Sequence, residues 1–168
     1  DYEAMTGVPF PGLNPYEILE KPGYANLGLA GPTDMWLCGL DKAGEWVLAH
    51  EAVHIWNSGG GPSWVGEGLA DYVGYLEMVK YDGVFLEVES REGYIAFWDE
   101  FKNTDNDYPL SEKKYDYTYG ATKNMIFWEL MNKEFGDEFI YACFTHNSTK
   151  PKLTNDDFRE LLMKFGEK

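Results

Sequence analysis

Two histidines four residues apart, His50 and His54, constrain this chain more than any other feature of its sequence. They belong to the segment His50-Glu51-Ala52-Val53-His54, whose apolar flanks suit a helix. Residues i and i+4 lie on one face of an α-helix, so both imidazoles can reach a single metal ion while Glu51 lies about a third of a turn away. The segment therefore predicts a metal-binding helix that carries a carboxylate beside the metal.

A third ligand is predicted at Glu67, beyond a break in the helical pattern. A catalytic zinc ion takes three protein ligands and keeps one position open. The glycines and the proline of residues 57–63 should end the first helix, and Ser63 can cap a second helix that runs from Trp64 to about Lys80. Two ligands would then come from one helix and a carboxylate from the next.

Asp71 shares the predicted face of Glu67, because the two residues are four positions apart. Gly68 and Ala70 are small enough to let the first helix approach closely. A metal-bound histidine usually donates its other ring N–H to a carboxylate or a carbonyl. Asp71 is therefore the predicted outer partner of one of the two histidines, and the sequence leaves open which one.

The alternative is a helix whose histidines are only satisfied polar groups on a half-buried face, in a helical scaffold without metal. A lone histidine would favour that interpretation. Here the His-Glu-x-x-His pattern is followed by a break, a restart and a Glu/Asp pair at helical spacing. The combination favours a metal site.

At these residues the chain resembles the gluzincin branch of the zincin metallopeptidases, in which HExxH is followed by a helix that carries a Glu ligand. The segment Pro62-Ser63-Trp64-Val65-Gly66-Glu67-Gly68-Leu69-Ala70-Asp71-Tyr72-Val73 is most similar to the peptidase MA-like and plant basic secretory protein groups. The resemblance implies that His50, His54 and Glu67 bind Zn²⁺, that Glu51 is the catalytic base and that Asp71 gives outer support. It also favours a secreted or extracytoplasmic location.

The composition fits one domain over residues 1–168, with 44% hydrophobic and 17% aromatic residues. A net charge of −15 argues against binding to nucleic acid or to anionic membranes, and no apolar run is long enough to span a bilayer. The chain begins with Asp1 rather than Met, so we take it as a processed form or a part of a longer protein. Cys38 and Cys143 are predicted to be free thiols.

The remaining elements follow from local patterns in chain order. A short helix at Tyr2–Thr6 and a strand at Tyr16–Leu19 precede two strands around a turn, Tyr24–Ala30 and Met35–Leu40, and Asp41 can cap the active-site helix. Tyr24–Ala30 is the candidate edge strand that pairs with an extended substrate, and the alternative is a hairpin that only supports the helix. Further helices are expected over these ranges: Arg91–Lys102, from Tyr115–Gly120 to Glu134, Asp137–Thr145, and Thr154–Phe165 with Thr154 as cap.

Hydrolysis through a tetrahedral intermediate also needs a donor aimed at the developing oxyanion. By resemblance, Tyr119 is the first candidate and Tyr117 the second, and the alternative is that both are packed aromatic residues. His146 reads as a lone surface histidine rather than a fourth ligand.

These patterns predict an α+β, zincin-like domain with a small N-terminal sheet packed on the active-site helix and a mainly helical C-terminal half. The expected activity is zinc-dependent hydrolysis of peptide bonds in a peptide or protein substrate, with Glu51 as general base. The alternative is a catalytically idle zinc-binding domain with an interaction or regulatory role. Glu51 argues against it, because a purely structural site has no use for that base.

Overall fold

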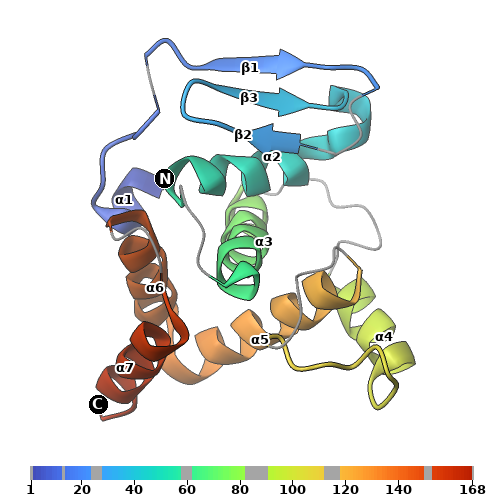
Figure 1. Cartoon of the computed structure of the whole chain (residues 1–168), viewed down its shortest axis with the longest axis vertical. Coiled ribbons are helices and arrows are strands. Elements are labelled where there is room, and N and C mark those ends of the chain that lie inside the picture. Colours follow the sequence, from blue (N-terminus) through green and yellow to red (C-terminus); the bar gives the residue numbers. More distant parts are fainter. Residues whose placement is uncertain are drawn as a thin grey trace.

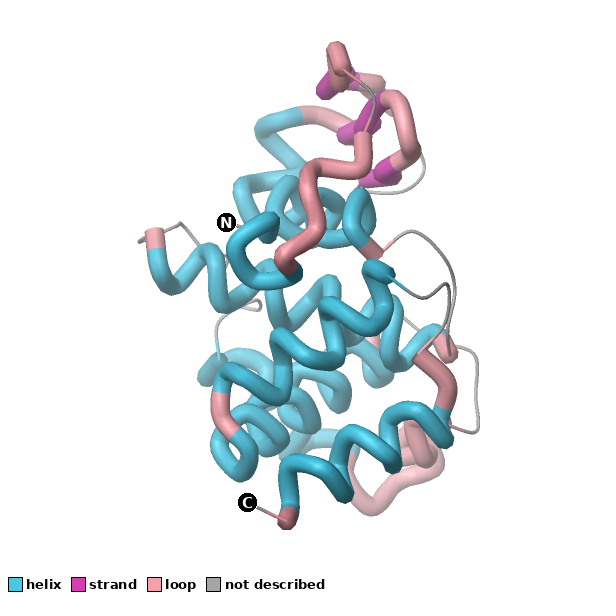
Figure 2. The backbone as a smooth tube through the Cα atoms, turned by 90° about the vertical axis from the view of Figure 1, so that its left-hand side faces the viewer, coloured by secondary structure: helices cyan, strands magenta, loops and turns pink. Residues whose placement is uncertain are grey.

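The computed structural model describes residues 2–12, 14–23, 28–57, 62–81, 91–111, 118–149 and 153–167, with the side chains of residues 40–44 excepted. Within this part the protein is a mixed α+β structure, mostly helical, with one small three-stranded sheet. The strands gather at one end of the molecule and helices make up the rest (Figures 1 and 2). The expected α+β class, with an N-terminal sheet and a helical C-terminal half, is confirmed.

The sheet consists of β1 (Glu17–Glu20), β2 (Gly28–Ala30) and β3 (Asp34–Leu37), in the order β1-β3-β2. β1 is parallel to β3 and β2 is antiparallel to it. Alternation along β3 buries Met35 and Leu37, and β2 and β3 both pack on α2 (Leu40–Trp56). The three predicted strands are present, but β1 is shifted by one residue and β3 ends at Leu37 rather than Leu40. Residues 24–27 of the candidate edge strand lie outside the described residues.

The central helix α3 (Ser63–Lys80) lies between α2 and α5 (Tyr119–Phe135), as Figure 1 shows. Both predicted caps of the central helices are wrong, Asp41 by two residues and Ser63 by one. α2 begins at Leu40, so Asp41 is already helical, and α3 begins at Ser63. The backbone of Pro62 is extended and its carbonyl accepts hydrogen bonds from the N–H groups of Val65 and Gly66, so the proline takes the cap position.

Gly74 sets the close crossing of α2 and α3. A Cβ atom at Gly74 would lie 3.1 Å from the backbone nitrogen of His50 and 3.3 Å from its Cα. Gly68, which the sequence suggested for this role, instead faces α5, where a Cβ would lie 2.7 Å from Nε1 of Trp128 and 2.9 Å from Cγ of Asn124. The expected close approach exists, and a different glycine makes it.

Four other helices complete the described part of the fold. They are α1 (Tyr2–Thr6), α4 (Arg91–Phe101), α6 (Asp137–Thr149) and α7 (Asn155–Gly166). Thr154 caps α7 in a capping box with Asp157, as predicted, whereas α6 runs four residues further than expected. Cys38 and Cys143 are free and buried, which confirms the predicted thiols. The largest fully buried side chains include Trp128, Phe139, Phe144, Met35 and Leu37.

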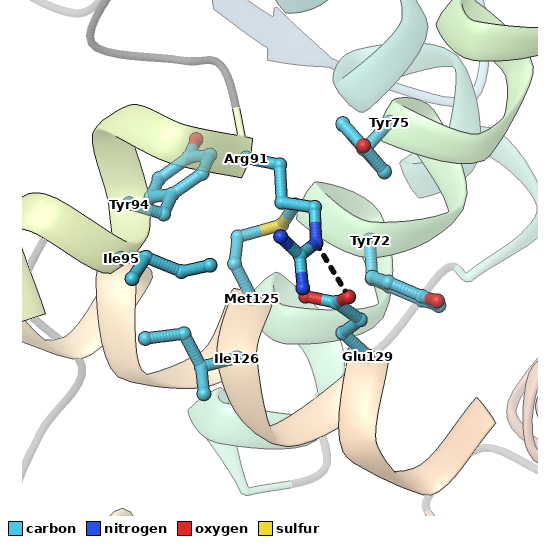
Figure 3. Close-up of a pocket in the computed structure, with 8 residues that line it drawn as sticks. All are labelled: Tyr72, Tyr75, Arg91, Tyr94, Ile95, Met125, Ile126 and Glu129. Carbon is cyan, nitrogen blue, oxygen red and sulfur yellow. Dashed lines mark hydrogen bonds and ion pairs between the residues drawn. The ribbon is translucent and has the colours of Figure 1, made fainter. Parts of the chain in front are cut away.

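Helices α3, α4 and α5 meet around a small pocket (Figure 3). Nε of Arg91 on α4 donates to Oε1 of Glu129 on α5 at 2.6 Å, across a lining that includes Tyr72 and Tyr75 of α3. The cavity is about 10 Å³, which is about the space that one water molecule needs. We interpret the pocket as a packing contact between the three helices and not as a substrate site.

No helix in the described part of the chain is both long and apolar enough to cross a membrane.

We expect Gly74→Ala to reduce the free energy of unfolding relative to Gly66→Ala, by about 1–3 kcal/mol. The new methyl group meets the backbone of α2, which cannot move without separating the helices, whereas a Cβ at Gly66 meets nothing within 4 Å. Both changes gain about the same helix propensity, so Gly66→Ala is the matched control. Urea denaturation of both variants measures the difference, and equal stabilities would contradict the close crossing.

Candidate metal centre

Three side chains from two helices converge in one cluster, which we call the His-His-Glu group: His50 and His54 of α2 and Glu67 of α3. Nε2 of His54 lies 3.1 Å from Nε2 of His50. Oε2 of Glu67 lies 3.5 Å from Nε2 of His50 and 3.4 Å from Nε2 of His54. The structure thus brings together the three residues that the sequence predicted as metal ligands.

The spacing of these three atoms suits a metal ion. A tetrahedral zinc ion with bonds of about 2.0–2.1 Å holds its ligand atoms about 3.3 Å apart, and the three separations here, 3.1, 3.4 and 3.5 Å, lie on either side of that value. Two imidazole nitrogens and a carboxylate oxygen are also a donor set that divalent transition metals accept. The group could therefore hold a metal ion, with a fourth position left for another ligand.

Asp71, one turn beyond Glu67 on α3, contacts the first histidine. Its Oδ1 lies 2.8 Å from Nδ1 of His50, and its side chain is only 2% exposed. This contact directs the opposite nitrogen, Nε2, toward His54 and Glu67. The sequence left open which histidine Asp71 contacts, and the structure shows that it is His50.

Trp46 packs against His50, with the centroids of the two rings 5.3 Å apart. The sequence pattern did not single out Trp46. Its position four residues before His50 was the available indication, because i and i+4 side chains touch on a helix. His50 is only 6% exposed, so water has little access to it.

Contacts among the clustered side chains control the protonation of His50 and Glu67 in the metal-free chain. Burial by itself would lower the pKa of His50, but the contacts with Asp71 and Glu67 outweigh it and raise that pKa to about 10. Burial likewise would raise the pKa of Glu67, but the two histidines lower it to about 2. His50 is therefore a cation and Glu67 an anion at neutral pH.

Glu51 is buried next to the His-His-Glu group, on the side of α2 that faces β2. Burial raises the pKa of its carboxyl group, while His50, His54 and a hydrogen bond with the backbone of Ala30 oppose the rise. A raised pKa suits a carboxyl group to take up and release a proton. Glu51 is thus placed beside the predicted ligands without being one of them.

Tyr119 begins α5 and packs against α4. Its ring stacks on Phe97 with centroids 5.6 Å apart and meets Phe101 edge-on at 4.9 Å. These contacts match the alternative in which Tyr119 is a packed aromatic residue, and its role toward an oxyanion stays a prediction. Tyr117 lies outside the described residues.

The third histidine, His146, belongs to a different part of the molecule. Its Nε2 lies 3.7 Å from Oδ2 of Asp157 on α7, and its side chain is 14% exposed. His146 is therefore half-buried rather than a surface residue, and, as expected, it is not a ligand of the His-His-Glu group.

The chain matches no protein-family model, no curated protein and no solved structure. We therefore infer the function of the His-His-Glu group from its geometry and chemistry.

We expect zinc binding at pH 7 to release a proton from His50, because the raised pKa keeps that imidazole protonated until a metal displaces the proton. Glu67 is already ionised and contributes none. Calorimetric titration in two buffers of different ionisation enthalpy measures the release. Asp71→Asn should reduce it, since Asp71 raises the pKa of His50. Equal binding heats in the two buffers for the unmodified chain would contradict the assignment.

Proposed function

We propose that this protein is a zinc-dependent peptidase of the gluzincin type, with a zincin-like fold. The observation that carries the proposal is the triangle of ligand atoms from His50, His54 and Glu67, with the buried carboxylate of Glu51 next to it. Two imidazoles, one carboxylate and an open fourth position are typical of catalytic zinc, whereas structural zinc normally has four protein ligands.

The residues divide the chemistry among them. His50, His54 and Glu67 would hold a zinc ion, which would supply Lewis acidity toward the attacking water and the scissile carbonyl. Glu51 accepts the proton of the attacking water and passes it to the leaving amine. Asp71 fixes the tautomer and orientation of His50 through the 2.8 Å contact. Trp46 packs against the ring of His50.

In the described part of the chain β2 is an edge strand of the sheet, and this edge supports a peptide as substrate. The N–H of Gly31 donates to the carbonyl of Asp34, and the carbonyl of Leu37 accepts from Lys21 beyond β1. In the antiparallel pattern, the N–H and C=O groups of Gly28 and Ala30 therefore point away from β3. The N–H of Ala30 donates to Glu51, and an extended peptide can add to the remaining groups of this edge as a further strand beside Glu51.

The alternative is an idle zinc-binding domain with an interaction or regulatory role. It predicts the same metal occupancy, so metal binding does not separate the two functions. The separation comes from Glu51, which a peptidase needs and an idle site does not.

The first test is metal content. We expect about one zinc ion per chain, measured by mass spectrometry on protein purified without added zinc. The double variant His50→Ala/His54→Ala should lose the metal. Glu67→Ala should weaken binding far more than Asp71→Ala, because the loss of an outer partner costs on the order of 10- to 100-fold. Stoichiometric metal in the double variant would place the site elsewhere, and full retention in Glu67→Ala would remove Glu67 as a ligand.

The second test is Glu51→Gln. The amide keeps the size of the side chain and removes the basic oxygen, so zinc should bind normally. Turnover of an unstructured protein substrate should fall by about 10²- to 10⁴-fold, the usual contribution of a general base. A zinc-loaded chain with no activity on a broad peptide library would favour the idle domain. Loss of zinc in Glu51→Gln would mean that Glu51 is a ligand and not a base.

A further inference from the structure

Gly28, at the start of β2, lies directly against the side chain of Glu51. A Cβ atom at Gly28 would be 2.6 Å from Cγ, 2.7 Å from Oε1 and 2.9 Å from Cδ of Glu51. Carbon and oxygen atoms do not approach a Cβ that closely, so any other residue at position 28 would displace the carboxylate. The space that Glu51 occupies exists only because residue 28 has no side chain.

The register of the sheet explains why the glycine faces the helix. Gly28 pairs with Leu37 and Ala30 pairs with Met35, and both partners on β3 are buried. Since cross-strand partners point to the same face, residues 28 and 30 point toward α2, whereas Leu29, which is 47% exposed, points to the opposite face. Glu51 is on α2, so the carboxylate is held between the helix and the free edge of β2.

Ala30 supplies a second contact from the same strand, because its backbone forms a hydrogen bond with the Glu51 carboxylate. This N–H points away from β3 in the antiparallel pattern and is available to a group outside the sheet. Glu51 therefore lies against Gly28, which has no side chain, and forms a hydrogen bond with the backbone of Ala30. The metal ligands belong to α2 and α3 and take no part in either contact.

We propose that Gly28 is a positioning residue for Glu51: its missing side chain and the Ala30 backbone together place the base carboxylate beside the His-His-Glu group. The proposal rests on the proposed peptidase function for its catalytic consequence, and on the strand geometry for the placement itself. It assigns β2 two tasks, since the same strand that offers its edge to a peptide also fixes the base.

The proposal predicts a loss of rate without a loss of stability. The atoms that a Cβ at residue 28 would meet, Cγ, Cδ and Oε1 of Glu51, all belong to a flexible side chain and none to the backbone. We therefore expect Gly28→Ala to keep the thermal unfolding midpoint and the zinc content. The value of kcat should fall about 10²-fold, the usual result of misplacing a reacting group by about 1 Å. KM should not change, because the edge N–H and C=O groups of β2 are intact.

A double-mutant cycle shows whether the effect passes through Glu51. In the Glu51→Gln background the base is already absent, so Gly28→Ala should cause no further loss of kcat. Leu29→Ala is the matched control on the same strand, because its side chain is on the opposite face, and it should leave kcat unchanged. An additive loss in the cycle, or the same loss in Leu29→Ala, would overturn the proposal.

Amide hydrogen exchange at Ala30 tests the placement without any activity. The hydrogen bond with Glu51 should protect this amide in the unmodified chain, and Gly28→Ala and Glu51→Ala should both speed its exchange. Unchanged exchange in both variants would overturn the proposal even if the protein is a peptidase. Faster exchange in a chain that hydrolyses no peptide would support the placement of Glu51 and reject only the peptidase function.

Discussion

The close crossing of α2 and α3 is the constraint on which the rest of the structure depends. Gly74 brings the two backbones together at His50, where a Cβ would lie only 3.1 Å from the backbone nitrogen. The same crossing places Asp71 beside Nδ1 of His50 and Glu67 beside Nε2 of both histidines. Because ligand atoms must meet within a few tenths of an ångström to share an ion, the separation of the two helices determines whether a metal centre exists at all.

The same crossing brings several ionisable side chains close together. The carboxylates of Glu51, Glu67 and Asp71 surround His50 and His54 in a largely buried place, within a chain of net charge −15. Buried carboxylates require a compensating cation, since removing them from water is costly. In the metal-free chain protonated His50 is that cation, because the neighbouring carboxylates raise its pKa. A divalent ion at the His-His-Glu group would fulfil the same requirement with more charge.

The predicted ligands and the predicted base are held by different elements. The packing of α2 and α3 fixes the predicted ligands His50, His54 and Glu67. Glu51 is fixed by β2, which packs on the side of α2 away from α3. The sheet reaches this position because Met35 and Leu37 of β3 bury themselves against α2. The proposed metal binding and the proposed proton transfer should therefore respond to different mutations.

The sequence by itself determined which side chains share a helical face, because helical periodicity is a local property: His50 with His54, and Glu67 with Asp71. It also indicated the short strands and the Thr154 cap, which depend on neighbouring residues. Only the tertiary structure decided that Gly74 and not Gly68 makes the crossing, and that Asp71 accompanies His50. Likewise, only the tertiary structure showed that Tyr119 packs on α4 and that Gly28 faces Glu51. These facts depend on the rotation and separation of elements far apart in the chain, which are set by core packing and leave no local pattern in the sequence.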